Sequence, residues 1–184
     1  MVVEAGSRGL RQVKVEALCR RADVTPEDFA AEFTSREECF LAAWDTVNER
    51  FVGRCIAAYS RPRRWRDKLR AAAEEFLCFV QNEPLSCRVL LVELLEAGPK
   101  GRARRDMSVR AFASLFDAGR AELDDPDSLP YEVALGIAGS IFVTLRAQLI
   151  EGTPEPAELM RELMCMAVMP YLGVEAAMHE LSAA

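Results

Sequence analysis

The residues of this chain whose types and spacing suggest a specific chemistry lie near its N-terminus. The segment Val15–Phe40 reads VEALCRRADVTPEDFAAEFTSREECF, and its apolar spacing predicts two short helices across a tight turn, followed by a longer helix. Thr25 is a good N-cap for the second helix, and Pro26 suits its first turn. This is the layout of a helix-turn-helix, whose second helix contacts base edges in the major groove of DNA. The expected chemistry is hydrogen bonding to bases and ion pairing with phosphates.

The charge of this segment does not favour DNA. The chain has a formal net charge of −6, and residues 1–50 contain seven Lys or Arg against ten Asp or Glu. Glu27, Asp28 and Glu32 lie on the predicted second helix, and like charges across an interface cost several kcal/mol. Alternatively, Glu27 and Asp28 only complement the helix dipole, each by roughly 0.3–1 kcal/mol. Carboxylates can also accept from cytosine N4, so both interpretations stay open.

Helical spacing continues along the whole chain. Helix-forming residues dominate and alternating β-branched runs are missing, so we predict an all-α protein. Phe29 and Phe33 are expected to be buried, with Val24 packed on Phe29. Gly98-Pro99 is expected to stop a helix. The helices predicted after the first two are 35–59, 65 to the Glu83-Pro84 break, 85–97, 107–121, 131–150, 157–172 and 174–181.

Several function classes lack the residues they need. The only histidine is His179, no Glu-x-x-His pair exists, and there is no Gly-rich phosphate loop or nucleophile elbow. We therefore expect no enzyme, no metal and no cofactor. The six cysteines form no C-x-x-C pair and are expected to be buried reduced thiols. No secretory signal is expected, and the longest uncharged run, Val133–Leu145, is too short to span a bilayer, which predicts a cytoplasmic protein without a membrane partner.

A small-molecule pocket is expected among the aromatic residues of the later helices. Glu93 and Arg146 each lie within an apolar run, and a charge held inside a protein is normally paired. Each is therefore either a structural ion pair or a group that orients a ligand, and the aromatic stripes are either plain core or a lining. The predicted ligand-binding residues are Phe76, Phe79, Leu90, Glu93, Leu94, Phe112, Phe116, Phe142 and Arg146.

A second copy of the chain is the firmest partner expected from the sequence. Gly136, Gly139 and Ser140 place small residues at helical spacing, which permits close approach of another helix, although they can also pack internally. The helix 157–172 is richly apolar for a chain end, and a four-helix seam between two copies would cover it. The predicted dimer-interface residues are Gly136, Gly139, Ser140, Val143, Leu159, Leu163, Met166, Ala167 and Tyr171.

Three segments together resemble one known family. Gly9–Phe40, Arg88–Pro99 (RVLLVELLEAGP) and Met169–Gly173 (MPYLG) are similar to TetR-type transcriptional repressors of actinobacterial type. The resemblance implies a homodimeric regulator that binds operator DNA and is controlled by a small, partly apolar effector. It divides the chain into a DNA-binding domain, 1–50, running into the connecting helix, and a ligand-binding and dimerisation domain, 51–184.

The chain departs from this family at two places. Only Met1–Arg8 precede Gly9, so the first helix is expected to be largely missing. The recognition helix carries carboxylates where small or polar residues are usual, while Arg36 keeps a cation expected at a phosphate, and the basic run from Lys100 to Arg110 could add contacts. The residues matched to DNA contacts are Lys14, Thr25, Pro26, Glu27, Asp28, Ala30, Ala31 and Arg36. The alternative is a degenerate relative that keeps the dimeric ligand-binding body but acts through protein partners.

Overall fold

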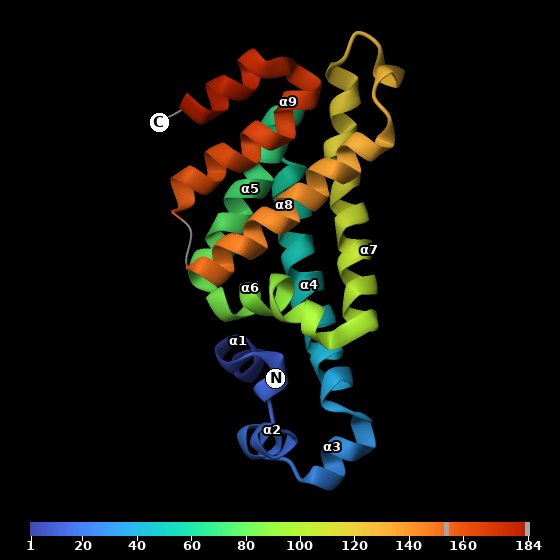
Figure 1. Ribbon diagram of the computed structural model, residues 1–184, viewed down its shortest axis with the longest axis vertical. Coiled ribbons are helices and arrows are strands. Elements are labelled where there is room, and N and C mark those ends of the chain that lie inside the picture. Colours follow the sequence, from blue (N-terminus) through green and yellow to red (C-terminus); the bar gives the residue numbers. More distant parts are fainter. Residues whose placement is uncertain (153–154, 183–184) are drawn as a thin grey trace.

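The structure is a computed structural model that describes residues 1–152 and 155–182. Its regular elements in these residues are all helical, which confirms the all-α prediction (Figure 1). A small group of helices lies at one end and a larger helical body at the other, and the long helix α4 (Arg36–Tyr59) runs from the first into the second (Figure 1). The predicted boundary at residue 50 therefore falls within one continuous helix.

The N-terminal group contains the predicted helix-turn-helix. It is built from α1 (Val2–Arg8), the 3-10 turn η1 (Leu10–Gln12), α2 (Val15–Ala22) and α3 (Pro26–Glu32), and these four elements are called the reader below. Asp23 ends α2 in the left-handed conformation with φ 56°, which turns the chain towards α3. Ser35 caps α4 by accepting a hydrogen bond from the backbone N–H of Glu38 at 3.1 Å. The element bounds agree closely with those predicted from residues 15 to 59.

The packing of α3 differs from the prediction. No residue of α3 is buried: Phe29 is half-buried, Phe33 just beyond the helix is also half-buried, and Val24 is 41% exposed. The two phenylalanine rings lie 5.5 Å apart, and Phe29 also packs against the edge of the core. The expectation that Phe29 and Phe33 are buried, with Val24 packed over Phe29, is wrong because α3 packs chiefly against the short helix α2.

Residues 2–8, which precede the glycine that begins the family-like segment, form the short helix α1. This helix packs on α6 (Pro84–Leu91) at the base of the body. Ala5 is fully buried there, and Gly6 lies so close to Leu85 that a Cβ at position 6 would be 2.7 Å from the Leu85 carbonyl oxygen. Such a contact is too short for any larger residue, so a glycine is needed at this crossing.

The body is formed by α4 to α9. Helix α5 (Trp65–Asn82) packs on α4, α7 (Gly98–Asp117) packs on α8 (Tyr131–Glu151), and α9 (Pro156–Ser182) packs on α5. The 3-10 turns η3 (Ala118–Glu122) and η4 (Pro126–Ser128) lie between α7 and α8. Figure 1 shows α8 and α9 running side by side across one face of the body.

Two helix boundaries were predicted wrongly. The segment 85–97 is not one helix but α6 followed by the 3-10 turn η2 (Glu93–Ala97), and Gly98-Pro99 begins α7 instead of ending a helix. Proline fits the first turn of a helix, where its missing N–H is not needed, and Gly98 adopts φ 70° to make the corner. The helix predicted for 107–121 therefore starts at residue 98.

Helix α9 contains the break that was predicted between 157–172 and 174–181. Gly173 has φ 81° inside the merged helix, and the tail beyond it is held against α5. Glu180, 1% exposed, forms ion pairs with Arg66 and Arg70, and Arg66 also lies 3.3 Å from His179 Nδ1. The short tail helix is thus fixed by charge as well as by apolar contact.

Helix α8 is the one described helix long and apolar enough to resemble a membrane span. It packs against α7 and α9, and its residues Ala134, Ile137 and Ala138 belong to the core of the body. These contacts make α8 a helix of the body, although only 28% of the residues in its most apolar stretch are buried in one protomer.

Candidate functional site

The start of α3 is organised by its own polar residues. Thr25 Oγ1 accepts a hydrogen bond from the Asp28 backbone N–H at 3.1 Å, and the Thr25 backbone N–H donates to Asp28 Oδ2 at 3.0 Å. The Thr25 hydroxyl also donates to Oδ2 at 2.8 Å, and the two donors of Thr25, the backbone N–H first, hold the pKa of the Asp28 carboxyl below its ordinary value. Pro26 occupies the first turn. The Asp28 carboxylate is thus turned towards the helix start as part of a capping box.

The outer surface of α3 is exposed and acidic. Glu27, Ala30, Ala31 and Glu32 are all exposed, and none of them forms an ion pair within the described residues. A DNA groove facing this helix would therefore meet two free carboxylates and two methyl groups. Base contacts of this surface would have to be made to cytosine N4 or to a thymine methyl group.

Arg36 faces the protein and not the solvent in front of α3. Its Nη1 donates to the backbone carbonyl oxygens of Arg11 at 3.0 Å and Val13 at 3.1 Å, and its guanidinium forms an ion pair with Glu37. Arg36 therefore ties the η1 segment to the first turn of α4. A phosphate could reach this guanidinium only by competing with these partners.

Other cations near the reader are free. Lys14, at the N-cap of α2, and Arg20 are exposed and form no ion pair within the described residues, and the same holds for Lys100 and Arg102 at the start of α7. The pKa of Glu38 is below its ordinary value because Thr34 donates to its carboxylate and, to a smaller extent, because Lys100 is near. The start of α7 thus lies beside the first turn of α4, as expected for the basic run from Lys100 to Arg110.

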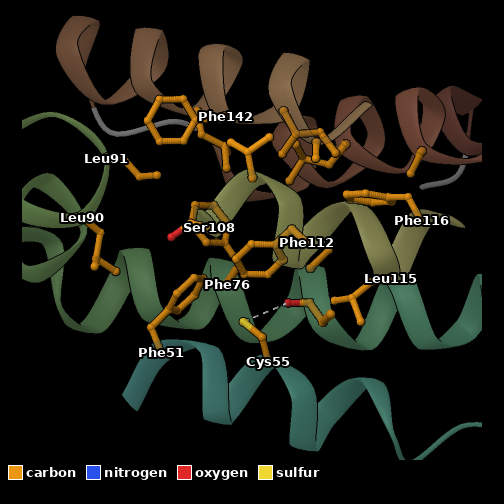
Figure 2. Close-up of a pocket in the computed structure, with 18 of the residues that line it drawn as sticks. Phe51, Cys55, Phe76, Leu90, Leu91, Ser108, Phe112, Leu115, Phe116 and Phe142 are labelled. Atoms are coloured by element: carbon orange, nitrogen blue, oxygen red, sulfur yellow. Dashed lines mark hydrogen bonds between the residues drawn. The ribbon is translucent and has the colours of Figure 1, made fainter. Parts of the chain in front are cut away.

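A cavity of about 140 Å³ lies inside the body between α4, α5, α7, α8 and α9 (Figure 2). Its walls are almost entirely apolar, and its lining includes residues from every one of these helices and from η2. Figure 2 shows the aromatic rings of Phe51, Phe76 and Phe112 together on one side, with Phe142 across from them. An engineered apolar cavity of about 150 Å³ binds benzene, so this cavity has room for a single small apolar molecule.

Six of the nine predicted ligand-binding residues line this cavity. They are Phe76, Leu90, Leu94, Phe112, Phe116 and Phe142. The other three, Phe79, Glu93 and Arg146, do not line it. Phe79 is fully buried on the far side of Phe51, with the ring centroids 5.0 Å apart, so it supports the wall without facing the space. Helical spacing predicted an aromatic stripe but not which of its members faces inwards.

Arg146 is a half-buried cation outside the cavity lining. Its Nε atom is buried and has no hydrogen-bond partner in the described part of the chain. The structure shows no pairing of Arg146 with Glu93, whose carboxylate is occupied elsewhere.

Three polar residues line the cavity that were not predicted from the sequence. Asn48, Arg105 and Ser108 all contribute to its surface. Arg105, Ser108 and Phe112 share one face of α7, at spacings of three and four residues. A helix predicted to begin at Met107 excludes Arg105, so the misplaced start of α7 hid this face.

Glu93 connects the body to the reader. Its Oε2 accepts a hydrogen bond from the buried backbone N–H of Leu10 at 2.8 Å, and Oε1 lies 3.6 Å from Arg88 Nη2. Glu96, one turn further along η2, forms an ion pair with Arg11. Leu94, between these two glutamates, lines the cavity. The same short turn therefore contacts the cavity with one side chain and the η1 segment with two others.

The predicted dimer-interface residues divide into two groups. Gly136, Ser140 and Val143 are exposed on α8, with Val143 64% exposed, and Gly139 and Met166 are half-exposed. Leu159, Leu163, Ala167 and Tyr171 on α9 are buried within one protomer. That face of α9 packs against the body, so little of these four side chains is left for a partner to contact. Met169, 42% exposed, lies on the outer face of α9.

The order of the helices, with a helix-turn-helix joined by α4 to a helical body that encloses a cavity, is that of the TetR-like transcriptional regulators. The chain matches the crystal structure of a TetR-like transcriptional regulator from Rhodococcus sp. RHA1 with a TM-score of 0.66 and 21% sequence identity. The match covers 92% of this chain and 90% of the other. No protein-family model matches the chain, and no curated protein matches it significantly. This similarity establishes a TetR-like fold.

Proposed function

We propose that this protein is a ligand-responsive transcriptional regulator of the TetR type, with residues 1–50 as the DNA-binding domain and 51–184 as the ligand-binding and dimerisation domain. A cytoplasmic location and the absence of enzymatic activity belong to the same proposal. The observation that carries it is η2, which touches both the effector cavity through Leu94 and the reader through Glu93 and Glu96. A ligand that displaces Leu94 would move the groups that hold η1.

The proposal includes a homodimer formed through α8 and α9. Only 28% of the residues in the most apolar stretch of α8 are buried in one protomer. Val143 and Ile150 on α8 and Met169 on α9 are among the large apolar residues left exposed. An exposed apolar surface of this kind marks an interaction site. A second copy would cover it, and two readers would then face two half-sites of a palindromic operator.

A specific observation also supports the alternative, a dimeric ligand-binding protein that does not read DNA. The exposed surface of α3 carries Glu27 and Glu32, and Arg36 is occupied by backbone carbonyl groups. Phosphate contacts supply much of the affinity of DNA-binding proteins. In this chain, phosphate contacts would depend on four exposed cations, which are Lys14, Arg20, Lys100 and Arg102.

The two proposals are separated by measuring binding to the DNA upstream of the protein's own gene. Fluorescence anisotropy with the purified full chain, at several salt concentrations, measures both affinity and the number of phosphate contacts. The regulator is expected to bind this DNA more tightly than an unrelated duplex, with affinity falling as salt rises. Equal, weak binding to both duplexes would favour the alternative.

A further inference from the structure

The cavity is polar at only one of its ends. Arg104 forms a bidentate pair with Asp45, at 2.8 and 2.7 Å, and this pair joins the first part of α7 to α4 at the level of Asn48. Arg105 and Ser108 therefore lie at the same end of the cavity as Asn48. Further along, the Leu115 carbonyl oxygen accepts from Tyr59 at 3.1 Å and from the Trp65 indole at 2.9 Å.

The opposite end is lined mainly by apolar side chains. Towards Leu115 the cavity wall on α7 continues with Phe116, and the facing walls are formed by other apolar residues. These include Leu69, Ala72, Met164 and Ala167. A molecule held in this cavity therefore has its polar group beside Asn48, Arg105 and Ser108 and its apolar part beside Phe112 and Phe116.

Of the three polar side chains at this end, Asn48 and Ser108 lack a protein partner within the described residues, and Arg105 is paired only with its neighbour Asp106. Asn48 and Ser108 make no side-chain hydrogen bond within the described residues, although Ser114 on the same helix donates to the carbonyl oxygen of Ala111 at 2.7 Å. The Arg105 Nε atom is buried and makes no hydrogen bond, but it forms an ion pair with Asp106 Oδ1 on the adjacent residue at 2.6 Å. No other ion pair of Arg105 is formed in residues 1–152 and 155–182.

Unpartnered donors at the end of an apolar cavity favour a ligand rich in acceptors. The guanidinium offers five N–H donors in a planar fork that matches a carboxylate, and Ser and Asn add a hydroxyl and an amide donor. An ammonium group would instead meet the positive charge of Arg105. A carboxylate here would be paired and hydrogen-bonded, which is the condition for burying a charge.

The polar end is also the end that opens to the surface. Arg105, Val109 and Phe142 line both the cavity and a groove between α7 and α8. Arg105 itself is about one-third exposed. A ligand can therefore place its apolar part inside and its charged group at the mouth, where part of its hydration is kept.

We propose that the effector of this protein is a small monocarboxylic acid with one aromatic ring or a branched apolar group of similar size, and that Arg105 and Ser108 bind its carboxylate. This rests on the proposed function only in taking the cavity as the effector site. Arg105 is then the residue that determines the charge of the ligand. The cavity volume limits the apolar part to about one ring.

Three probes of one shape and different charge test this assignment. Phenylacetate, phenylacetamide and 2-phenylethylammonium are titrated into the full chain by isothermal titration calorimetry, without DNA. Phenylacetate is expected to bind on the order of tenfold to a hundredfold more tightly than the amide, as for hydrogen bonds to a charged group. The ammonium compound is expected to bind most weakly.

Variants locate the preference in the cavity. Arg105→Met and Ser108→Ala should reduce or abolish the preference for phenylacetate over the amide, because the charged carboxylate loses more binding energy than the neutral amide when these donors are removed. Arg110→Met is the matched control, because Arg110 lies on the same helix and lines the groove but not the cavity. It should keep the full preference.

Each result that differs from these expectations rejects a different part of the proposal. Equal or tighter binding of phenylacetamide to the unaltered protein would overturn the carboxylate assignment and leave the regulator proposal standing. A preference that survives in Arg105→Met would overturn the role of Arg105. Failure of all three probes to bind at millimolar concentration would reject the one-ring ligand class. Absence of DNA binding, measured separately, would count against the regulator and not against this site.

Discussion

The backbone N–H of Leu10 donates a 2.8 Å hydrogen bond to the Glu93 carboxylate, across 83 positions of sequence. Both groups are buried, with Leu10 1% and Glu93 5% exposed. This contact joins the N-terminal helices to the turn η2, whose Leu94 lines the cavity of the body. A buried charge is retained here because its partners are a backbone donor and the nearby Arg88.

Replacing Glu93 by Ala should destabilise the protein by about 1–3 kcal/mol, because the Leu10 N–H would be buried without an acceptor. Chemical denaturation measures this loss, and hydrogen exchange of the Leu10 amide should accelerate. Glu93→Gln is the matched control, since its amide oxygen can still accept from Leu10. If Glu93→Ala and Glu93→Gln had equal stability, the hydrogen bond would not be the stabilising contact.

Arg36→Ala should lower stability without changing the salt dependence of DNA binding. Its guanidinium is bound to the carbonyl oxygens of Arg11 and Val13, so its removal loosens η1 but removes no phosphate contact. Lys14→Ala should instead lower the salt slope by about one, as expected for one lost phosphate contact. Anisotropy titrations at several salt concentrations measure the salt slope of each variant. A reduced slope in Arg36→Ala would show that DNA draws this side chain outwards.

The double substitution Glu27→Gln and Glu32→Gln should tighten DNA binding by about tenfold, because it removes two carboxylates facing a polyanion. Glu122→Gln, which changes an exposed glutamate in η3, is the control for net charge. Its affinity for DNA should stay close to that of the unaltered protein. Unchanged or weaker binding of the double variant would mean that these carboxylates contact bases.

Val143→Arg should convert a dimer into a monomer, since it places a charge in the exposed apolar face of α8. Light scattering after size-exclusion chromatography gives the mass. Met107→Arg is the control because Met107, 67% exposed on α7, lies outside the proposed interface. A Val143→Arg protein that still has the mass of two chains would place the interface elsewhere.

Burial raises the pKa of the Cys55 thiol to about 12, from an ordinary value of 9.0. The folded protein thus keeps a proton that the unfolded chain loses above pH 9. The stability contributed by this neutral thiol is fully present below about pH 9 and is lost as pH rises towards 12. Cys55→Ala should therefore flatten the decline of unfolding free energy over this range. Alkylation of Cys55 in the native protein at pH 8 would contradict its burial.

The sequence was sufficient to predict most helices, because their apolar spacing and caps are local signals. Helix α2 and the Thr25 cap of α3 are examples. The aromatic cavity lining was also largely predictable from stripes on α5 and α7. These features depend on residues a few positions apart, which a sequence displays directly.

The features that could not be predicted depend on which helix faces pack against one another in the folded protein. Leu159 and Tyr171 were assigned to a dimer seam, but the body of the same protomer covers them. Periodicity shows that a helix has an apolar face and does not identify its neighbour. The hydrogen-bond partners of Glu93 and Arg36 could not be predicted from the sequence either, because they are backbone groups far away along the chain.

Binding of the full chain to the DNA upstream of its own gene tests the central claim most directly. The account predicts a dimer that binds this DNA more tightly than an unrelated duplex, and that loses affinity as salt rises. Addition of a saturating effector is predicted to change that affinity. A folded dimer that binds both duplexes equally weakly, even at low salt, would contradict the claim that this protein is a transcriptional regulator.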